Sequence, residues 1–250
     1  MLKTKYFLSF CIPVHNEAEV ISLMIKKIQT DLKKILKDKS FEILIVENGS
    51  TDNTLSKLRG VKDKNIKIIS LAKKSHGLAL KTAIINAKGE NILLTAIDLP
   101  FGFSDLNEML KISNNYPLIF GSKSHSESVI YTSASRKIAS SIYRLFLKKL
   151  FSIHVGDTQG TVFLKKTDIL PILKFCDSSN AFFSAQLAIY SEREDIKITE
   201  VPVIMDKKIL RKSKYNIFSN GYEMLLSMLK TYIDLKFNYI NQRRLNDFII

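Results

Sequence analysis

At 250 residues, 46% of them hydrophobic, the chain can form one α/β domain with a sizeable core, and no stretch reaches the ~18 consecutive apolar residues of a membrane-spanning helix. The formal net charge of +14 favours an anionic partner, namely nucleic acid, an anionic membrane surface or a phosphorylated substrate, although a solvated lysine surface explains it equally well. The chain has no Cys/His finger, helix-turn-helix signature or aromatic-basic RNA-binding box, so we expect no nucleic-acid partner. Cys11 and Cys176 lack metal-site spacing and indicate free thiols in a reducing compartment.

Strands and helices alternate in the first part of the chain. Four segments rich in β-formers are predicted as strands, at residues 6–12, 41–46, 66–71 and 91–95. Between them, the sequence predicts helices at residues 17–36, around Leu55 and Leu58, and at 78–87. This alternation with short connections predicts a mostly parallel sheet with right-handed crossovers and helices on both faces.

The second part of the chain continues the α/β pattern less regularly. It predicts a strand at 118–121, a mobile Ser-rich loop at 122–135, a basic amphipathic helix at 136–150, and a turn followed by a strand at 157–164. Short helices at 168–175 and 182–193, an edge-like strand at 196–203, a basic loop at 205–215 and a last helix at 222–239 follow. No composition break forces a second domain, so we expect one domain over residues 1–235 and a basic tail at 236–250.

Three polar turns follow predicted strands: PVHNE after the first, ENGSTDNT after the second and AIDLP after the fourth. Because ligands of open α/β sheets bind beyond the carboxyl ends of the strands, we expect these turns to form one pocket. Asp98 lies directly beyond the fourth strand, where a carboxylate is suited to holding a divalent cation or a sugar hydroxyl. The alternative is that Asp98 caps a turn before Pro100.

Seven blocks of sequence, in order, resemble glycosyltransferase family 2 and, within it, the dolichyl-phosphate (polyprenyl-phosphate) sugar synthases. The blocks are IPVHNEAE, VENGSTDNT, LAKKSHGLALKTAIINAKGENILLTAID, DTQGTVFLKKTDIL, FFSAQLAIYSE, ITEVPV and RKSK. The resemblance extends to residue 235 and implies a GT-A (Rossmann-like) nucleotide-diphosphosugar transferase. Such an enzyme would move a hexose from a nucleotide sugar to polyprenyl phosphate, with inversion at the anomeric carbon and with Mg²⁺ or Mn²⁺ as cofactor.

The resemblance also implies roles for individual residues of this chain. Asp98 would be catalytic and hold the metal ion, and Asp157 would lie near the reacting centre. The implied nucleotide-sugar-binding residues are Pro13, His15, Glu17, Glu47, Asp52, His76, Lys81, Gln159, Lys208, Arg211, Ser213 and Lys214. Turn or helix capping is the alternative for Glu47 and Asp52. A solvated surface is the alternative for His76, for Lys81 and for the basic loop.

The sequence departs from the family pattern at several positions. The Asp-X-Asp turn reads Ala96-Ile97-Asp98, Asn48 replaces a second acid, Gln186 falls where Glu is common, and Lys208 stands where Arg is typical. The first three changes remove negative charge from the expected metal and acceptor region. A cation held by Asp98 and diphosphate oxygens, weak metal dependence, and loss of transfer all remain open. The alternative functions are therefore an impaired relative that binds nucleotide or glycan for a partner, and a transferase to a glycan or protein hydroxyl.

Two predicted helices, at 136–150 and from 222, are basic and amphipathic. Such helices lie on an anionic bilayer without crossing it, or they pack on a core with lysines in water. Together with a lipid-phosphate acceptor, they predict a cytoplasmic protein that is peripheral at the inner membrane face.

Overall fold

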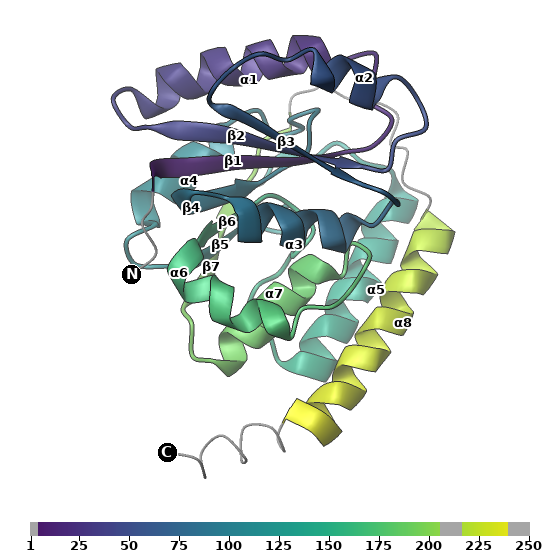
Figure 1. Ribbon diagram of the computed structural model, residues 1–250. Coiled ribbons are helices and arrows are strands. Elements are labelled where there is room, and N and C mark those ends of the chain that lie inside the picture. Colours follow the sequence, from purple (N-terminus) through teal and green to yellow (C-terminus); the bar gives the residue numbers. More distant parts are fainter. Residues whose placement is uncertain (1–4, 206–216, 240–250) are drawn as a thin grey trace, which may run out of the picture. The chain divides into compact units, whose positions relative to one another are not determined.

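The computed structural model describes residues 5–205 and 217–239, with side chains at 217–220 and 238–239 left aside (Figure 1). The chain forms two compact units. The sheet unit comprises Met1–Tyr131 and Val155–Lys212, and the helical unit comprises Thr132–His154 and Ser213–Ile250.

The sheet unit is built on a mostly parallel sheet, as predicted. Its seven described strands are β1 (Tyr6–Val14), β2 (Phe41–Asn48), β3 (Ile66–Leu71), β4 (Gly89–Leu94), β5 (Leu118–Ser122), β6 (Val162–Lys165) and β7 (Ile198–Pro202). Their order in the sheet is β3-β2-β1-β4-β6-β5-β7, and β6 runs antiparallel to both of its neighbours. The predicted edge strand is β7, at the end of this order.

Helices cover both faces of the sheet, which confirms the prediction (Figure 1). They are α1 (Ile21–Leu36), α2 (Thr54–Arg59), α3 (His76–Asn86), α4 (Ser104–Ile112), α6 (Lys166–Ile169), the 3-10 helix η1 (Leu170–Lys174) and α7 (Phe183–Arg193). Alternate residues of a strand face opposite sides. Leu8, Phe10 and Ile12 of β1 therefore share one core with α1 and α4. The buried alanines Ala79 and Ala83 let α3 pack closely on β1 and β2, where Cys11 is also buried.

Helix α4 was not predicted. Its N-cap residue is Phe103, which makes no side-chain capping hydrogen bond, although Ser104 and Asp105 follow it at once. The preceding Pro100 and Gly102 indicate a turn rather than a helix start. Burial of Leu106 and Met109 against the sheet stabilises the helix, which makes it a product of tertiary packing.

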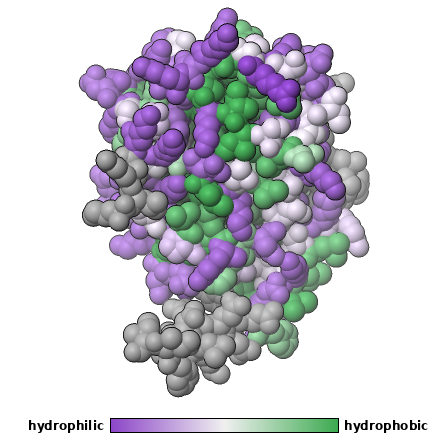
Figure 2. All heavy atoms as spheres, viewed as in Figure 1, coloured by the Kyte–Doolittle hydropathy of each residue, from purple (hydrophilic) through white to green (hydrophobic). Residues whose placement is uncertain are grey.

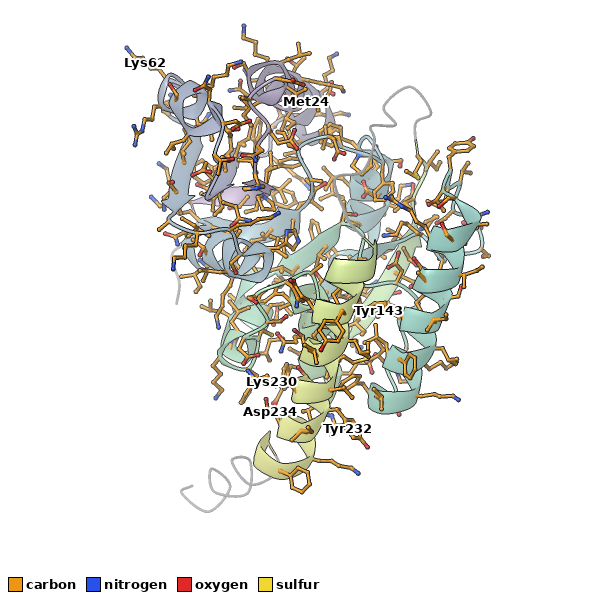
Figure 3. All side chains as sticks on the ribbon, turned by 90° about the vertical axis from the view of Figure 1, so that its right-hand side faces the viewer. Met24, Lys62, Tyr143, Lys230, Tyr232 and Asp234 are labelled. Atoms are coloured by element: carbon orange, nitrogen blue, oxygen red, sulfur yellow. The ribbon has the colours of Figure 1, made fainter. Side chains whose placement is uncertain are left out.

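The helical unit contains α5 (Ala134–Phe151) and α8 (Ile217–Asp234), followed by the π-helical turn η3 (Leu235–Tyr239). The two helices pack side by side, and the rings of Phe151 and Tyr232 meet edge to face at 6.1 Å between centroids (Figure 3). No helix among the described residues combines the length and hydrophobicity that crossing a bilayer requires. Residues 240–250 of the predicted tail lie outside the described part of the chain.

Substituting Gly160 tests the close approach of β5 and β6. A Cβ atom at Gly160 would lie 1.8 Å from the backbone oxygen of Gly121, which cannot rotate away. We expect Gly160→Ala to lower the free energy of unfolding by about 1–3 kcal/mol, the usual cost of overpacking. Thermal and urea unfolding measure this change.

Gly60→Ala is the matched control in the same unit, since its Cβ would lie 3.3 Å from the Lys57 oxygen. Its effect should stay below about 1 kcal/mol. Equal stability of the two variants would contradict the described packing of β5 against the turn before β6.

Candidate functional site at the carboxyl edge of the sheet

The polar turns predicted to converge do follow strands that end at one edge of the sheet. Strands β1, β2, β3 and β4 are parallel, so the segments after them leave at the same edge. Because β6 is antiparallel, its first residue, Val162, pairs with both Leu94 at the end of β4 and Phe120 near the end of β5. The DTQG turn before β6 therefore belongs to this edge as well.

The turns after β1 and β2 are joined by hydrogen bonds from the backbone to side chains. The amide of Asn16 donates to Ser50 Oγ at 3.0 Å, and the amide of Glu17 donates to Thr54 Oγ1 at 2.8 Å. Asp52 accepts from the amide of Ala18 at 3.2 Å and also from the amide of Thr54 at 2.9 Å. Asp52 thus shapes its own turn and binds the neighbouring one, which fixes the two corners relative to each other.

His15 and Asn48 extend this connection to the loop before α3. His15 Nδ1 lies 3.0 Å from the backbone oxygen of Asn48. Because a carbonyl oxygen accepts hydrogen bonds, Nδ1 carries the proton of this contact. The Asn48 side-chain oxygen accepts from the amide of Ser75 at 2.7 Å, and Ser75 caps α3. Gly49 has a left-handed backbone conformation (φ +64°), which permits the sharp turn of the chain directly after Asn48.

Glu47 lies near the end of β2, is 1% exposed, and stabilises the turn that follows this strand. One carboxylate oxygen accepts from the amide of Ser50 at 2.5 Å and the other from Ser70 Oγ at 2.6 Å. Burial alone would raise the pKa of Glu47, but the hydrogen bonds from Ser70 and Ser50, with nearby His15, hold it below its ordinary value. Glu47 is therefore ionised at neutral pH. Its predicted contact with a nucleobase stays a prediction.

Four other residues predicted to bind the nucleotide sugar lie in a strand, on a helix surface or in contacts within the protein. Pro13 lies within β1, paired with Val46 of β2. His76 is exposed in the first turn of α3. The Lys81 ammonium donates to the backbone oxygen of Cys176 at 2.9 Å, a contact within the protein. Gln159 Nε2 donates to the Ala181 oxygen at 3.1 Å.

The turn after β4 carries Asp98. The amide of Thr95 donates to the Cys11 oxygen at 3.1 Å, so the chain stays beside β1 for one residue beyond the strand. Leu99 then adopts a left-handed conformation (φ +45°), and its amide donates to the Ala96 oxygen at 3.2 Å. This tight turn leaves Ala96 exposed and Asp98 half-buried.

Asp157, the second predicted catalytic residue, is 5% exposed and paired with Lys123. Its Oδ2 accepts from the Lys123 amide at 3.0 Å and lies 3.2 Å from the Lys123 ammonium. Its Oδ1 accepts from the amide of Gln159 at 2.9 Å, and the Lys123 ammonium donates to the Gln159 oxygen at 2.7 Å. An ion pair between a buried carboxylate and a partly exposed lysine therefore joins β5 to the turn before β6.

A second buried carboxyl group lies between α4 and β6. Asp105 is 2% exposed and accepts hydrogen bonds from Thr161 Oγ1 and from the Leu106 amide. Burial raises the pKa of Asp105, and these hydrogen bonds offset part of the shift. Asp105 supports the turn before β6, because Thr161 adjoins it in sequence.

The residues present do not fit a divalent cation held mainly by the protein. Among residues 5–205 and 217–239, no three His, Cys, Asp or Glu side chains are grouped as metal ligands. Ala96 offers no ligand, and the oxygens of Asp157 are engaged as described. Hard cations such as Mg²⁺ require oxygen ligands.

The residues of the predicted basic loop, Lys208, Arg211, Ser213 and Lys214, lie outside the described part of the chain. Gln186, which replaces a common Glu, is buried on α7. Its amide donates to Asp177 at 2.9 Å and accepts from the amide of Ser178 at 2.8 Å. The neutral side chain thus orders the loop before α7.

Sequence reasoning missed Lys123 and Asp105. Lys123 fell in a segment interpreted as a mobile loop, although it lies two residues beyond a predicted strand, the region in which ligand-contacting side chains of α/β sheets are found. The start of that segment is tied down, because Ser128 Oγ donates to the Ser122 oxygen at 2.6 Å and accepts from the Val203 amide at 2.9 Å. Asp105 had no signal, since its partner lies 56 residues away.

This architecture is that of the GT-A glycosyltransferases. A crystal structure of glucosyl-3-phosphoglycerate synthase from Mycobacterium tuberculosis, in complex with Mn²⁺, UDP-glucose and phosphoglyceric acid, superposes with a TM-score of 0.63. The alignment covers 91% of this chain and 80% of that one at 14% identity, and so establishes a shared fold. The chain belongs to glycosyl transferase family 2, whose sequence pattern matches residues 9–170.

Two curated relatives were also found. The chain is 28% identical over 225 residues to the dolichyl-phosphate beta-glucosyltransferase of Saccharomyces cerevisiae, a match that covers 79% of this chain and 66% of the relative. It is 21% identical over 206 residues to glycosyltransferase AglD of Haloferax volcanii, covering 80% of this chain and 33% of that relative. The chain thus spans less than two thirds of the length of each.

Replacing Glu47 tests whether its ionised carboxylate stabilises the fold at the carboxyl edge of the sheet. Because the folded-state pKa of Glu47 lies below its ordinary value, the native state binds fewer protons than the unfolded state between the two values. The stabilisation is thus complete above the ordinary pKa and is lost as pH falls through the folded one. We expect Glu47→Gln to lower the free energy of unfolding at pH 7 by about 1–3 kcal/mol and to weaken its pH dependence in the acid range.

The control is Glu108→Gln, which removes an exposed carboxylate paired with Lys111 at 2.7 Å. A surface pair of this kind contributes roughly 0–1 kcal/mol. Urea unfolding from pH 7 into the acid range compares the two variants. An unchanged pH dependence for Glu47→Gln would show that Glu47 is not the stabilised anion described.

Proposed function

We propose that the chain transfers a hexose from a nucleoside diphosphate sugar to a polyprenyl phosphate at a membrane surface. The observation that carries the proposal is the meeting of four polar segments at one sheet edge, after β1, β2 and β4 and before β6. Family membership supports the reaction class. The relative named dolichyl-phosphate beta-glucosyltransferase supports a lipid-linked phosphate as acceptor.

In this proposal, the corner between β1 and β2 binds the nucleoside. The hydrogen-bonded pair of turns presents His15 and Glu17 on a fixed backbone, and His15 has its Nδ1 proton on Asn48. The Nε2 side of the ring is then left to contact a base or a ribose hydroxyl. Glu47 and Asp52 hold this corner in shape and thereby position the groups that contact the nucleotide.

The reaction is a single displacement. An oxygen of the acceptor phosphate attacks the anomeric carbon, the bond from that carbon to the diphosphate breaks, and its electron pair leaves on the diphosphate oxygen. An ionised phosphate needs no base, whereas a hydroxyl acceptor would. Asp98, beyond β4, contacts the sugar hydroxyls, and a Mg²⁺ or Mn²⁺ ion would find few protein ligands there. Asp157 acts through Lys123 and positions it.

The helical unit supplies a surface suited to an anionic bilayer. Large apolar side chains recur at helical spacing on the exposed faces of α5 and α8 and on η3, and Figure 2 shows hydrophobic surface over α8. These residues are Ile138, Ile142, Leu145, Phe146, Tyr222, Leu225, Leu226, Leu229, Ile233 and Phe237. Basic residues accompany them, at Arg136, Lys137, Arg144, Lys148, Lys149, Lys230 and Lys236. Apolar faces flanked by cations are typical of helices that lie in the membrane interface.

The presence of Ala96 in place of an acid in the turn beyond β4 favours a second candidate function, which is binding without catalysis. A relative with this change could bind nucleotide or glycan for a partner protein without transferring sugar. Nucleotide binding without turnover on any donor would favour this alternative.

The transfer assay uses UDP- and GDP-hexoses with a short-chain polyprenyl phosphate, with and without Mn²⁺. We expect a lipid-linked sugar product from at least one donor, and a loss of roughly 10²- to 10³-fold in kcat for Asp98→Asn, as for other lost transition-state contacts. The control is Asp31→Asn, which changes an acid paired with Lys27 on α1. Turnover that is indifferent to Asp98→Asn would remove Asp98 from the reaction.

Vesicle sedimentation tests the membrane surface. We expect the protein to bind phosphatidylglycerol vesicles better than phosphatidylcholine vesicles. The pair Ile142→Glu and Leu229→Glu should weaken binding by tenfold or more, because burying one such side chain contributes about 1.5–3 kcal/mol. Leu23→Glu is the control, since Leu23 is exposed on α1 of the sheet unit. Equal binding by all variants would rule out these helix faces as the contact.

A further inference from the structure

The carboxylates that could hold a cation at the carboxyl edge are either replaced or already engaged. Ala96 stands in place of an acid. Both carboxylate oxygens of Glu47 already accept hydrogen bonds, one from Ser50 and one from Ser70. Asp157 accepts two amide hydrogen bonds and pairs with Lys123, so both of its oxygens are engaged. Among the described residues, Asp98 is half-buried beyond β4 and has no second acid beside it in the turn, because that position is Ala96.

A cationic group occupies the same edge. Lys123 follows β5, and its ammonium is anchored on Asp157 at 3.2 Å and on the Gln159 oxygen at 2.7 Å. An ammonium has three N–H donors. Within the part of the chain that the structure describes, the third donor of Lys123 has no assigned partner. The side chain is 29% exposed, so this donor can reach a ligand.

We infer that the chain binds the diphosphate of its nucleotide without a divalent cation, and that the Lys123 ammonium supplies the positive charge. This inference rests on the proposed function, because it concerns the diphosphate leaving group of that reaction. The anchors on Asp157 and Gln159 fix the ammonium before the ligand arrives, so little side-chain entropy is lost on binding. As the sugar leaves, the diphosphate gains negative charge, and the fixed cation stabilises it.

The ion pair with Asp157 does not cancel this role. Asp157 is buried, whereas the Lys123 side chain keeps 29% of its surface exposed, so the pair is open to solvent at its lysine. An ammonium binds phosphate as a point charge, so the remaining N–H is sufficient for one charge-assisted hydrogen bond. Were Lys123 a purely structural partner of Asp157, removing its charge would change stability and leave nucleotide affinity as it was.

Isothermal titration of UDP and GDP tests the inference without requiring turnover. We expect at least one nucleotide to bind with the same Kd in EDTA and in Mn²⁺. Lys123→Met should weaken binding in EDTA by roughly 10- to 100-fold, the range for a lost hydrogen bond to a charged group. Lys123→Arg should retain most of the affinity. Lys111→Met, at an exposed lysine of α4, is the control and should bind as the unchanged protein does.

Thermal unfolding accompanies each variant, because Lys123→Met leaves a buried carboxylate unpaired. If that variant does not fold, Lys123→Met with Asp157→Asn removes both charges together and gives the same comparison. Binding that requires Mn²⁺ would overturn the inference and leave the proposed function standing, as would unchanged affinity in the Lys123 variants. Absence of UDP and GDP binding in both buffers would instead overturn the proposed function.

The turn beyond β4 offers the reciprocal test. Ala96 is exposed, so Ala96→Asp adds a carboxylate beside Asp98 without a packing cost. We expect Mn²⁺ to strengthen nucleotide binding by this variant about tenfold or more, as a second oxygen ligand completes a cation site. If its affinity stays indifferent to Mn²⁺, the assignment of Ala96 as the position that abolishes cation binding is wrong.

Discussion

The antiparallel insertion of β6 between β4 and β5 is the constraint on which the site depends. Because β6 enters the sheet from the edge where its neighbours end, the DTQG turn is brought to the ends of β4 and β5. The pair between Lys123 and Asp157 then joins the end of β5 to this turn. A parallel strand at the same place would have carried that turn to the opposite edge, away from His15, Glu47 and Asp98.

The chemistry of this edge follows from how its charges are used. Glu47 and Asp157 are buried, and each accepts hydrogen bonds from the backbone of its own turn. Buried carboxylates of this kind fix the turns that donate to them, because leaving the carboxylates unpaired would cost free energy. The carboxylate oxygens of Glu47 and Asp157 are therefore engaged within the protein, and the anchored Lys123 can bind an anionic ligand directly.

Much of the sheet could be predicted from the sequence, because short β-rich runs are separated by dense turn clusters. The segment 66–71 coincides with β3, and the meeting of the turns follows from the rule for parallel strands. The antiparallel direction of β6 could not be predicted, since it depends on pairing between distant segments. Helix α4 follows a turn with Pro100 and Gly102 and has Phe103 as its N-cap, and the contacts of Asp105 with Thr161 and of Lys123 with Asp157 span 56 and 34 residues. The identity of such partners is set by the folded chain rather than by local pattern.

Hydrogen exchange of backbone amides with and without UDP or GDP tests the central claim most directly, since it reports which segments a nucleotide covers. The account predicts slower exchange in peptides that contain residues 13–18, 47–54, 95–100, 121–124 and 156–160, while the peptide covering 25–36 of α1 exchanges as before. Protection confined to other surfaces, or none at nucleotide concentrations that saturate binding, would contradict the claim that these turns form one nucleotide site.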